Sequence, residues 1–267
     1  MLADFLSGCE SIAVLSGAGV STASGIPDYR DRNGDWKPAQ PIQYSDFVNS
    51  ANSRRRYWAR SYVGWERFSA ARPNAAHHAL ADLETTGLVD TLITQNVDRL
   101  HHEAGSRRVI ELHGDLSKVR CLSCDRAHPR SEYQRDLRDG NPGWRAEAFR
   151  YTPDGDAELA ADSHLSFTVP DCAECGGIVK PDVVMFGETV PKERVQNAKD
   201  AIDRVDALLV VGSSLMVFSG FRFARWTSEQ NKPIAIVNQG RTRADDLAVL
   251  KVDADCGRVL SEVSSAI

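Results

Sequence analysis

The chain has 267 residues, of which 42% are hydrophobic and 26% are charged, and its formal net charge is -5 at pH 7. This length allows one large domain with a full core and a smaller lobe. The negative charge argues against non-specific binding to nucleic acid, and the basic run Arg54, Arg55 and Arg56 is typical of a solvated helix face. No stretch approaches the roughly 20 apolar residues of a membrane span. We therefore expect no direct nucleic-acid or membrane partner.

Short apolar runs and helical patterns alternate along much of the chain. Runs rich in Val, Ile and Leu, each ending in polar residues or glycine, occupy residues 11–15, 88–94, 207–212 and 233–238. Residues 74–85 and 192–205 have helical patterns. This alternation predicts an α/β fold with a doubly wound parallel sheet, as in Rossmann-like domains.

The first apolar run leads directly into a glycine-rich loop, Gly17-Ala18-Gly19. Glycines there would let the backbone approach a pyrophosphate, and a following helix would direct its N-terminus at the phosphates. However, Thr22 replaces the third glycine of the usual dinucleotide fingerprint, and no acidic residue ends a second strand about 20 residues later. Taken alone, the loop also fits a glycine turn that packs a helix against a strand.

Two segments interrupt the alternation. Residues 36–72 are aromatic and basic, and the spacing of their aromatic residues predicts a helical module. Residues 116–182 carry a long polar insert with the turn sequences NPGW and PDGD. This second segment predicts a separate small lobe.

Two Cys-x-x-Cys pairs, Cys121/Cys124 and Cys172/Cys175, flank the polar insert. Four thiolates fill the tetrahedral shell of Zn²⁺ and leave no open position, so the pattern predicts one structural zinc ion. Disulfides are disfavoured because the first residues lack the apolar core of a signal peptide, and we expect a cytoplasmic protein. Cys9 and Cys256 are left unpaired.

A set of motifs resembles those of the sirtuin family of NAD-dependent protein deacylases. They are GAGVSTASGIPDYR at 17–30, TQNVDRLH at 94–101, HGD at 113–115, FGE at 186–188, GSS at 212–214 and a strand-end Asn238. The resemblance covers essentially the whole chain. RRRYWARSYVGW at 54–65, together with the NPGW and PDGD turns, is similar to the class II branch, typified by the mitochondrial sirtuin four of animals, here without a leader.

The resemblance implies three parts. Residues 1–35, 73–115 and 183–267 would form the Rossmann-like NAD-binding domain, residues 36–72 the helical module with the cofactor loop, and residues 116–182 the zinc-binding lobe. NAD would be a co-substrate. The residues implied in its binding are Gly17, Ala18, Gly19, Asp28, Tyr29, Arg30, Gln95, Asn96, Asp98, Gly212, Ser213, Ser214, Asn238 and Cys256.

The resemblance also implies catalytic roles for His113, Asn96 and Asp98. His113 would be the general base that takes a proton from a ribose hydroxyl, a task that suits an imidazole because its pKa lies near operating pH. Asn96 and Asp98 would lie on the nicotinamide side of the site. The expected products are free lysine, nicotinamide and acylated ADP-ribose.

The expected partners are acylated-lysine proteins or peptides. The segment Val184, Met185, Phe186, Gly187 and Glu188 would pair with an extended substrate peptide through backbone hydrogen bonds. Tyr57 and Arg60, three residues apart on one helix face, could grip a carboxylate at the end of an acyl chain, as in the desuccinylase branch of sirtuins, or could only pack the module. The preferred acyl group and the oligomeric state stay open, with a monomer expected.

Three other activities are compatible with parts of the pattern. A protein nucleophile could trap the same ribosyl intermediate, which would make the chain a mono-ADP-ribosyltransferase. A non-enzymatic NAD-sensing module is disfavoured because such a module needs no general base. A hydride-transferring dehydrogenase is disfavoured by the broken glycine fingerprint.

Overall fold

The computed structural model describes residues 1–37 and 41–267, and these form two compact units. We call residues 1–37, 72–112 and 190–267 the sheet unit. The described residues 41–71 and 113–189 are the cysteine unit. Each unit is described separately.

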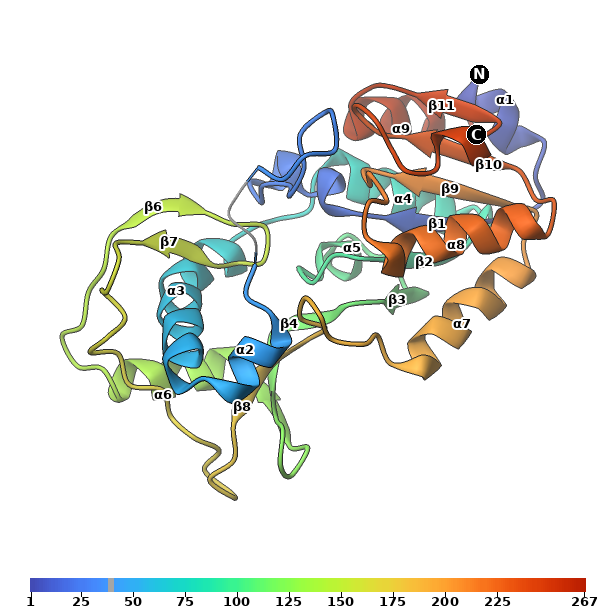
Figure 1. Cartoon of the computed structure of the whole chain (residues 1–267). Coiled ribbons are helices and arrows are strands. Elements are labelled where there is room, and N and C mark those ends of the chain that lie inside the picture. Colours follow the sequence, from blue (N-terminus) through green and yellow to red (C-terminus); the bar gives the residue numbers. More distant parts are fainter. Residues whose placement is uncertain (38–40) are drawn as a thin grey trace. The chain divides into compact units, whose positions relative to one another are not determined.

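A six-stranded parallel sheet forms the centre of the sheet unit, with the strand order β11-β10-β9-β1-β2-β3. The strands are β1 (Ile12–Ser16), β2 (Val89–Thr94), β3 (Val109–Glu111), β9 (Ala207–Val211), β10 (Ile234–Val237) and β11 (Leu250–Val252). β1, β9 and β10 are buried along their whole length, because helices cover both faces of the sheet (Figure 1). The predicted doubly wound α/β fold is confirmed.

The helices of this unit are α1 (Leu2–Ser7), α4 (Ala75–Thr85), α5 (Leu100–Glu103), α7 (Lys192–Asp203), α8 (Phe218–Glu229) and α9 (Cys256–Ser264). α4 begins where Asn74 caps its first turn, with the Asn74 side chain accepting from the Ala76 amide at 2.9 Å. α4 and α7 fall on the two predicted helical segments.

The glycine-rich loop does not lead into an α-helix, so the expectation of a helix N-terminus aimed at the phosphates was wrong. Two short 3₁₀ turns follow β1 instead, Ala18–Val20 and Thr22–Ser24. Gly25, in the left-handed region at φ 84°, ends the second turn, and Pro27 follows two residues later. These short 3₁₀ turns, rather than the N-terminus of an α-helix, therefore follow the glycine-rich loop at this end of the sheet.

The cysteine unit combines helices and small antiparallel sheets. Its helices are α2 (Tyr44–Asn49), α3 (Ala51–Ser69) and α6 (Arg130–Asp139), and its strands are β4 (Gly114–Cys121), β5 (Ala127–Pro129), β6 (Ala148–Tyr151), β7 (Ala157–Leu159) and β8 (Val179–Val183). β4 lies between β5 and β8, while β6 and β7 form a separate hairpin.

One hydrophobic core joins the helices and the cysteine-bearing segment of this unit. Trp58 of α3 is fully buried, and its indole N–H donates to the Val179 carbonyl of β8 at 3.2 Å. Cys121 and Cys172 belong to the same core. The helical segment and the lobe thus form one unit, which also contains residues 113–115 and 183–189. Within the described part of the chain, no helix is both long and apolar enough to cross a membrane.

Candidate functional site

Three polar loops leave the same edge of the parallel sheet. Ser16, the last residue of β1, is in register with Thr94 of β2 and Val211 of β9. The ladder continues into the loops, since the Gly17 amide donates to the Val211 carbonyl at 3.0 Å and the Gln95 amide donates to the Ser16 carbonyl at 3.0 Å. Strand order reverses around β1, and ligands of open α/β sheets bind at such a point.

The glycines at this edge are required by the packing of loop on loop. A Cβ on Gly19 would lie 2.9 Å from the Gly212 carbonyl oxygen, and one on Gly17 would lie 2.7 Å from Cβ of Ser213. Gly212 itself has φ 59°, in the region that favours glycine. Gly17, Gly19 and Gly212 therefore allow the two loops to contact each other, and Ala18 lies between the first two; the role of these four residues in NAD binding stays a prediction.

Asn96 and Asp98 meet the hydroxyl of Ser21, a residue that the sequence analysis did not single out. Ser21 Oγ donates to Asp98 Oδ2 at 2.6 Å, and Asn96 Nδ2 donates to Ser21 Oγ and to the Gly17 carbonyl, both at 3.1 Å. Burial raises the pKa of Asp98, while hydrogen bonds from Ser21 and the Leu100 amide act in the opposite direction. Ser21 thus joins the glycine-rich loop to the Asn96–Asp98 segment, and only its position in the loop could have indicated this.

Gln95 bridges β1 and the loop after β9. Its Nε2 donates to Ser213 Oγ at 2.8 Å and to the Ser16 carbonyl at 3.2 Å. Gly220, in the first turn of α8, leaves room for this side chain, because a Cβ there would lie 2.3 Å from Gln95 Oε1. Ser214 follows Ser213 in the same loop, and the Ser214 carbonyl accepts a hydrogen bond from the Arg243 amide at 2.8 Å.

Asp28, Tyr29 and Arg30 lie in a loop that folds back on itself. Asp28 pairs with Lys37 at 2.5 Å, and Arg30 donates to the Gly34 carbonyl at 2.9 Å. The Arg30 guanidinium also stacks on the Trp36 ring, 3.8 Å from its centroid. The loop is an ordered hairpin in which Arg30 already has two partners, so a role toward NAD for these three residues stays a prediction.

Asn238 and Cys256 lie at the end of β10. Asn238 is buried, and its Nδ2 donates to the Gln239 carbonyl at 2.9 Å. Cys256 Sγ donates to the Val237 carbonyl at 3.6 Å, and burial raises the pKa of this thiol to about 12. Cys9 is half-buried near the N-terminus, where burial also raises the pKa of its thiol. Neither thiol is disposed to react as a thiolate at neutral pH.

In the cysteine unit, His113 immediately precedes β4. The His113 carbonyl accepts from the Val184 amide at 2.8 Å, which ties the residue to the segment after β8. Gly114 has φ 90°, and a Cβ there would lie 2.2 Å from the Asp182 carbonyl oxygen. Only glycine fits this position, so the glycine of the HGD motif sets the place of His113. Asp115 is buried and accepts from the Ser117 amide at 2.8 Å.

The segment 184–188 turns tightly around the side chain of Glu188. Glu188 Oε2 accepts from the Met185 amide at 2.8 Å and pairs with buried Lys180 at 2.9 Å, and Lys180 Nζ also donates to the Val183 carbonyl. Gly187 has φ 80°, as this turn requires. The Phe186 carbonyl accepts from the Tyr44 amide at 2.8 Å. The Glu188 side chain thus stabilises the turn of residues 184–188 through its hydrogen bond to Met185 and its ion pair with Lys180. No local sequence pattern indicated this lysine.

Tyr57 and Arg60 both lie on α3, but their surroundings differ. Tyr57 is 5% exposed, with its ring in edge contact with Phe47 and Trp58. Arg60 is half-buried, and its Nε donates to the Ala157 carbonyl at 3.0 Å. Tyr57 is therefore a core residue, whereas Nη1 and Nη2 of Arg60 make no hydrogen bond with any residue that the structure describes.

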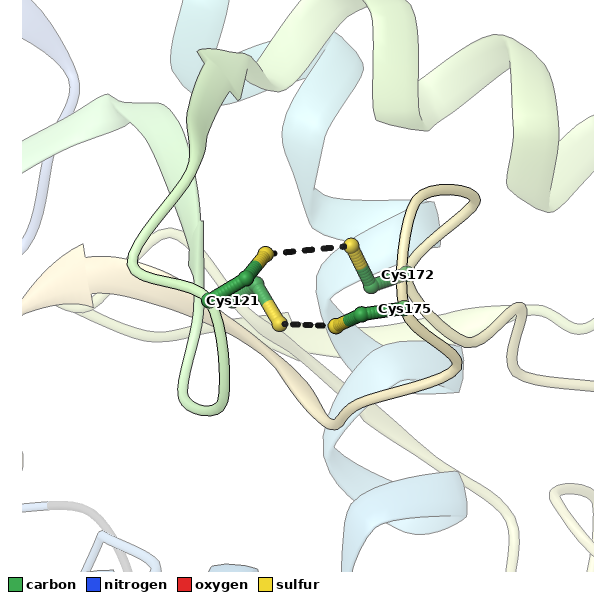
Figure 2. Close-up of side chains that lie close together, drawn as sticks. Cys121, Cys172 and Cys175 are labelled. Carbon is green, nitrogen blue, oxygen red and sulfur yellow. Dashed lines mark hydrogen bonds between the residues drawn. The ribbon is translucent and has the colours of Figure 1, made fainter.

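The four paired cysteines converge on one point (Figure 2). Their sulfur atoms all lie within 4.8 Å of one another, with 3.5 Å between Cys121 and Cys175 and 3.8 Å between Cys124 and Cys172. These separations are far too long for disulfides. They fit the edges of a tetrahedron of about 3.8 Å that Zn–S bonds of about 2.3 Å produce.

The donor set at this cluster also fits zinc chemically. The backbone amides of Cys124 and Ser123 lower the pKa of the Cys121 thiol to about 6, whereas the neighbouring cysteine sulfurs raise the pKa of Cys175 to about 12. A coordinated Zn²⁺ deprotonates its thiol ligands, so all four sulfurs can serve as thiolates. The four sulfurs leave no coordination position open for water or substrate. A zinc ion at Cys121, Cys124, Cys172 and Cys175 would therefore hold the unit together and take no part in the reaction.

The fold and these motifs define a family. Residues 17–219 match the model of the Sir2 family, and the chain belongs to this family. It is 56% identical to an NAD-dependent protein deacetylase of Bordetella bronchiseptica over 99% of this chain and 96% of the relative. It is 46% identical to the NAD-dependent protein deacylase Sirt4 of Drosophila melanogaster over 98% of this chain and 85% of the relative.

Comparison with solved structures also identifies members of the Sir2 family. A structure of Sir2 with a p53 peptide and NAD⁺ is 30% identical, with a TM-score of 0.79 over 99% of this chain and 96% of that one. A structure of Sir2 bound to an acetylated peptide is 29% identical, with a TM-score of 0.78 over 99% of this chain and 96% of that one. The family resemblance inferred from the motifs is confirmed.

Proposed function

We propose that this NAD-dependent protein-lysine deacylase binds NAD at the carboxyl edge of β1, β2 and β9 and uses His113 as its general base. The observation that carries the proposal is the convergence of three loops at one sheet edge. There Gln95, Asn96 and Asp98 are already oriented by hydrogen bonds to Ser16, Ser21 and Ser213. Side chains held in this way need little ordering when a ligand binds.

The donors and acceptors at this edge suit a dinucleotide. The amide of Ala18 and the hydroxyl of Ser213 can donate to phosphates or ribose, while Gln95 and Asn96 can pair with hydroxyl or carboxamide groups. Asp98 would hold Ser21 and Asn96 in place. When bound, NAD supplies an electrophilic ribose carbon that takes the acyl oxygen of the modified lysine as nicotinamide leaves.

The residues of the cysteine unit would position the acylated peptide and move a proton. The segment 184–188 directly follows β8, an edge strand of its sheet, and the Val184 carbonyl could accept a hydrogen bond from an added peptide strand. His113 would accept the proton of a ribose hydroxyl, so that the hydroxyl oxygen can attack the acyl carbon. Loss of the lysine amine and addition of one water molecule then give free lysine and acylated ADP-ribose.

The direct test is an incubation of the purified chain with NAD and an acetyl-lysine peptide, followed by mass spectrometry. We expect nicotinamide and deacetylated peptide in equal amounts. ADP-ribose attached to protein would indicate a transferase instead, a reduced cofactor would indicate hydride transfer, and no product from acetyl, long-chain, dicarboxyl or lipoyl peptides would contradict the proposal. The same panel identifies the preferred acyl group.

We also propose a cytoplasmic location. Four clustered cysteines that are spaced for metal rather than for disulfides suit a reducing compartment. Fractionation of cells that express the chain at natural levels tests this placement.

A further inference from the structure

Two buried histidines of the sheet unit lie ring against ring, close to the polar edge of the sheet. His77 of α4 is 0% exposed and His101 of α5 is 1% exposed, and their ring centroids are 4.8 Å apart. Each ring uses one nitrogen in a hydrogen bond. Within residues 1–37 and 41–267, the other nitrogens, His77 Nε2 and His101 Nδ1, have no hydrogen-bond partner although both are buried.

The partner of His77 determines where its proton lies. The backbone N–H of Asn74 donates to His77 Nδ1 at 3.2 Å, as part of the capping box that begins α4. Nδ1 must therefore be an acceptor, and a neutral ring then carries its proton on Nε2. Protonation of Nδ1 would bring two N–H groups against each other. The buried Nε2 of His77 is thus a donor.

The hydrogen-bond partners of His101 indicate which nitrogen of its ring carries the proton. His101 Nε2 lies 2.9 Å from Ser16 Oγ, and Ser16 Oγ donates its single proton to Thr94 Oγ1 at 2.9 Å. With the Ser16 proton directed to Thr94, Ser16 accepts from His101, so the proton of His101 lies on Nε2 and its Nδ1 is an acceptor. This is the tautomer that complements the Nε2–H of His77. Burial lowers the pKa of His77 to about 4 and that of His101 well below its usual value, so both rings are neutral at pH 7.

We propose that His77 and His101 are positioning residues for NAD, joined through one buried water that accepts from His77 Nε2 and donates to His101 Nδ1. The two nitrogens without partners form a matched donor and acceptor on adjacent rings. Pairing them removes the cost of two unsatisfied buried polar groups. A one-directional relay then runs from Asn74 through both rings to Ser16 and Thr94.

The ends of the relay reach two of the loops assigned to NAD, and the inference rests on that assignment. At one end, Asn74 Nδ2 donates to the Val20 carbonyl and to Ser24 Oγ, both at 2.8 Å, so it holds the turns after the glycines. At the other end, Thr94 Oγ1 also accepts from the Asn96 amide at 3.1 Å. The relay would therefore fix the spacing between the glycine-rich loop and the Gln95–Asn96 segment.

The tautomers can be observed without any activity measurement. Long-range ¹H–¹⁵N correlation spectra of the ¹⁵N-histidine-labelled full chain at pH 7, assigned with His77→Asn and His101→Gln, should show both rings neutral with the proton on Nε2. A charged ring, or a proton on Nδ1 of either ring, would overturn the relay.

Two single variants each remove one end of the proposed connection between His77 Nε2 and His101 Nδ1. His77→Asn keeps an acceptor for the Asn74 amide but is too short to place a donor where His77 Nε2 lies, whereas His101→Gln keeps a donor for Ser16 but lacks the ring nitrogen Nδ1. We expect each to raise the KM for NAD about three- to tenfold, the range that one buried hydrogen bond supplies. The kcat and the KM for peptide should change less than about twofold. The double variant should be no worse than the poorer single variant, because both break one link.

The matched control is His78→Gln, which alters the exposed neighbour on α4 and should leave all constants unchanged. Multiplying effects in the double variant, or an unchanged KM for NAD in folded single variants, would contradict the positioning role. Asn96→Ala separates the two proposals. If Asn96→Ala impairs NAD use and the histidine variants do not, the relay fails; if Asn96→Ala has no effect, the assignment of the NAD site fails.

Discussion

The two units bury different kinds of residue. In the sheet unit, the central strands are apolar throughout, and the polar residues gather where the strands end. In the cysteine unit, charged side chains enter the interior, including Arg130 at 0%, Asp156 at 2% and Lys180 at 5% exposure. The sheet unit is therefore stabilised by a continuous apolar core, whereas the cysteine unit depends on its metal ligands and also holds ionisable side chains in its interior.

Arg130 is one of these buried ionisable side chains. Its guanidinium lies over the rings of Trp58 and Trp65, 5.2 and 4.9 Å from their centroids, and donates to Gln134 at 2.6 Å. Buried charges of this kind contribute little net stability but are costly to leave unpaired. We therefore expect the cysteine unit to respond more strongly than the sheet unit to loss of a single interaction.

Loss of the zinc ligands should have the largest effect. The wild-type chain should contain one zinc ion, and the double variant Cys121→Ala/Cys172→Ala should contain none. Since such sites supply folding free energy directly, the cysteine unit should then unfold and deacylation should be lost. Metal analysis together with limited proteolysis measures both effects. Cys9→Ala is the matched control and should keep its zinc; full zinc retention in the double variant would contradict the assignment.

Replacement of His113 should abolish turnover without unfolding either unit. His113→Ala removes the proposed base, and such losses cost on the order of 10²-fold or more in kcat. His113→Tyr should behave alike. Steady-state kinetics at saturating NAD, with zinc content and thermal unfolding measured in parallel, test this. His128→Ala, which changes a histidine of β5 in the same unit, should retain activity. Near-normal turnover of the His113 variants would exclude the general-base role.

The sheet unit was the more predictable of the two. The apolar runs identified β1, β2, β9 and β10 to within one or two residues, because fully buried parallel strands leave a strong local signal. The edge strands β3 and β11 left little signal, since each has three residues and is only half-buried. The polar partners at the sheet edge, such as Ser21 with Asp98, are far apart in sequence and emerge only from the register of the strands.

In the cysteine unit, the spacing of the cysteines predicted the metal cluster, but no sequence pattern predicted the tertiary contacts of the core. Two Cys-x-x-Cys pairs sufficed to predict the metal cluster, because each pair brings its ligands together locally. Nothing local indicated that Trp58 would pack against β8 or that Asp156 would be buried beside Arg130. The first contact joins residues 121 apart and the second joins residues 26 apart (156 − 130), so the periodicity of a single element cannot reveal either.

The two units should also respond to pH in opposite directions. His77 has a pKa lowered to about 4, below its unfolded value of about 6.5, so the stability of the sheet unit should fall as pH falls between these values. Burial raises the pKa of Asp156 well above 3.8, so this residue should destabilise the cysteine unit as pH rises above that value. Each group contributes at most about 1.4 kcal/mol per pH unit.

Unfolding free energies measured at several pH values in single variants separate these contributions. His77→Asn should flatten the loss of stability below pH 6.5. Asp156→Asn, a neutral isostere, should gain stability relative to the wild type as pH rises from 5 to 8. A parallel pH dependence of Asp156→Asn and the wild type would show that Asp156 has the same pKa in the folded and unfolded chain.

The smallest expected effect concerns the choice of acyl group. Tyr57 is packed in the core, so the hypothesis that it and Arg60 grip a carboxylate now depends on Arg60, whose Nη atoms make no hydrogen bond with the described residues. Because Arg60 is half-buried, solvent would screen an ion pair between its guanidinium and an acyl carboxylate, and loss of that pair costs up to about fivefold in affinity. Arg60→Met should therefore raise the KM for a succinyl or glutaryl peptide several-fold more than that for an acetyl peptide.

Two comparisons distinguish this role from packing. Arg56→Met, which replaces an exposed arginine one turn earlier on α3, should leave both substrates unaffected. Because Arg60 Nε donates to the Ala157 carbonyl, a purely structural Arg60 would instead anchor the β6–β7 hairpin. In that case Arg60→Met would lower the melting temperature and weaken both substrates equally. Absence of any activity on carboxyl-ended acyl groups would likewise assign Arg60 to the hairpin, and the acyl group would then be selected by other residues.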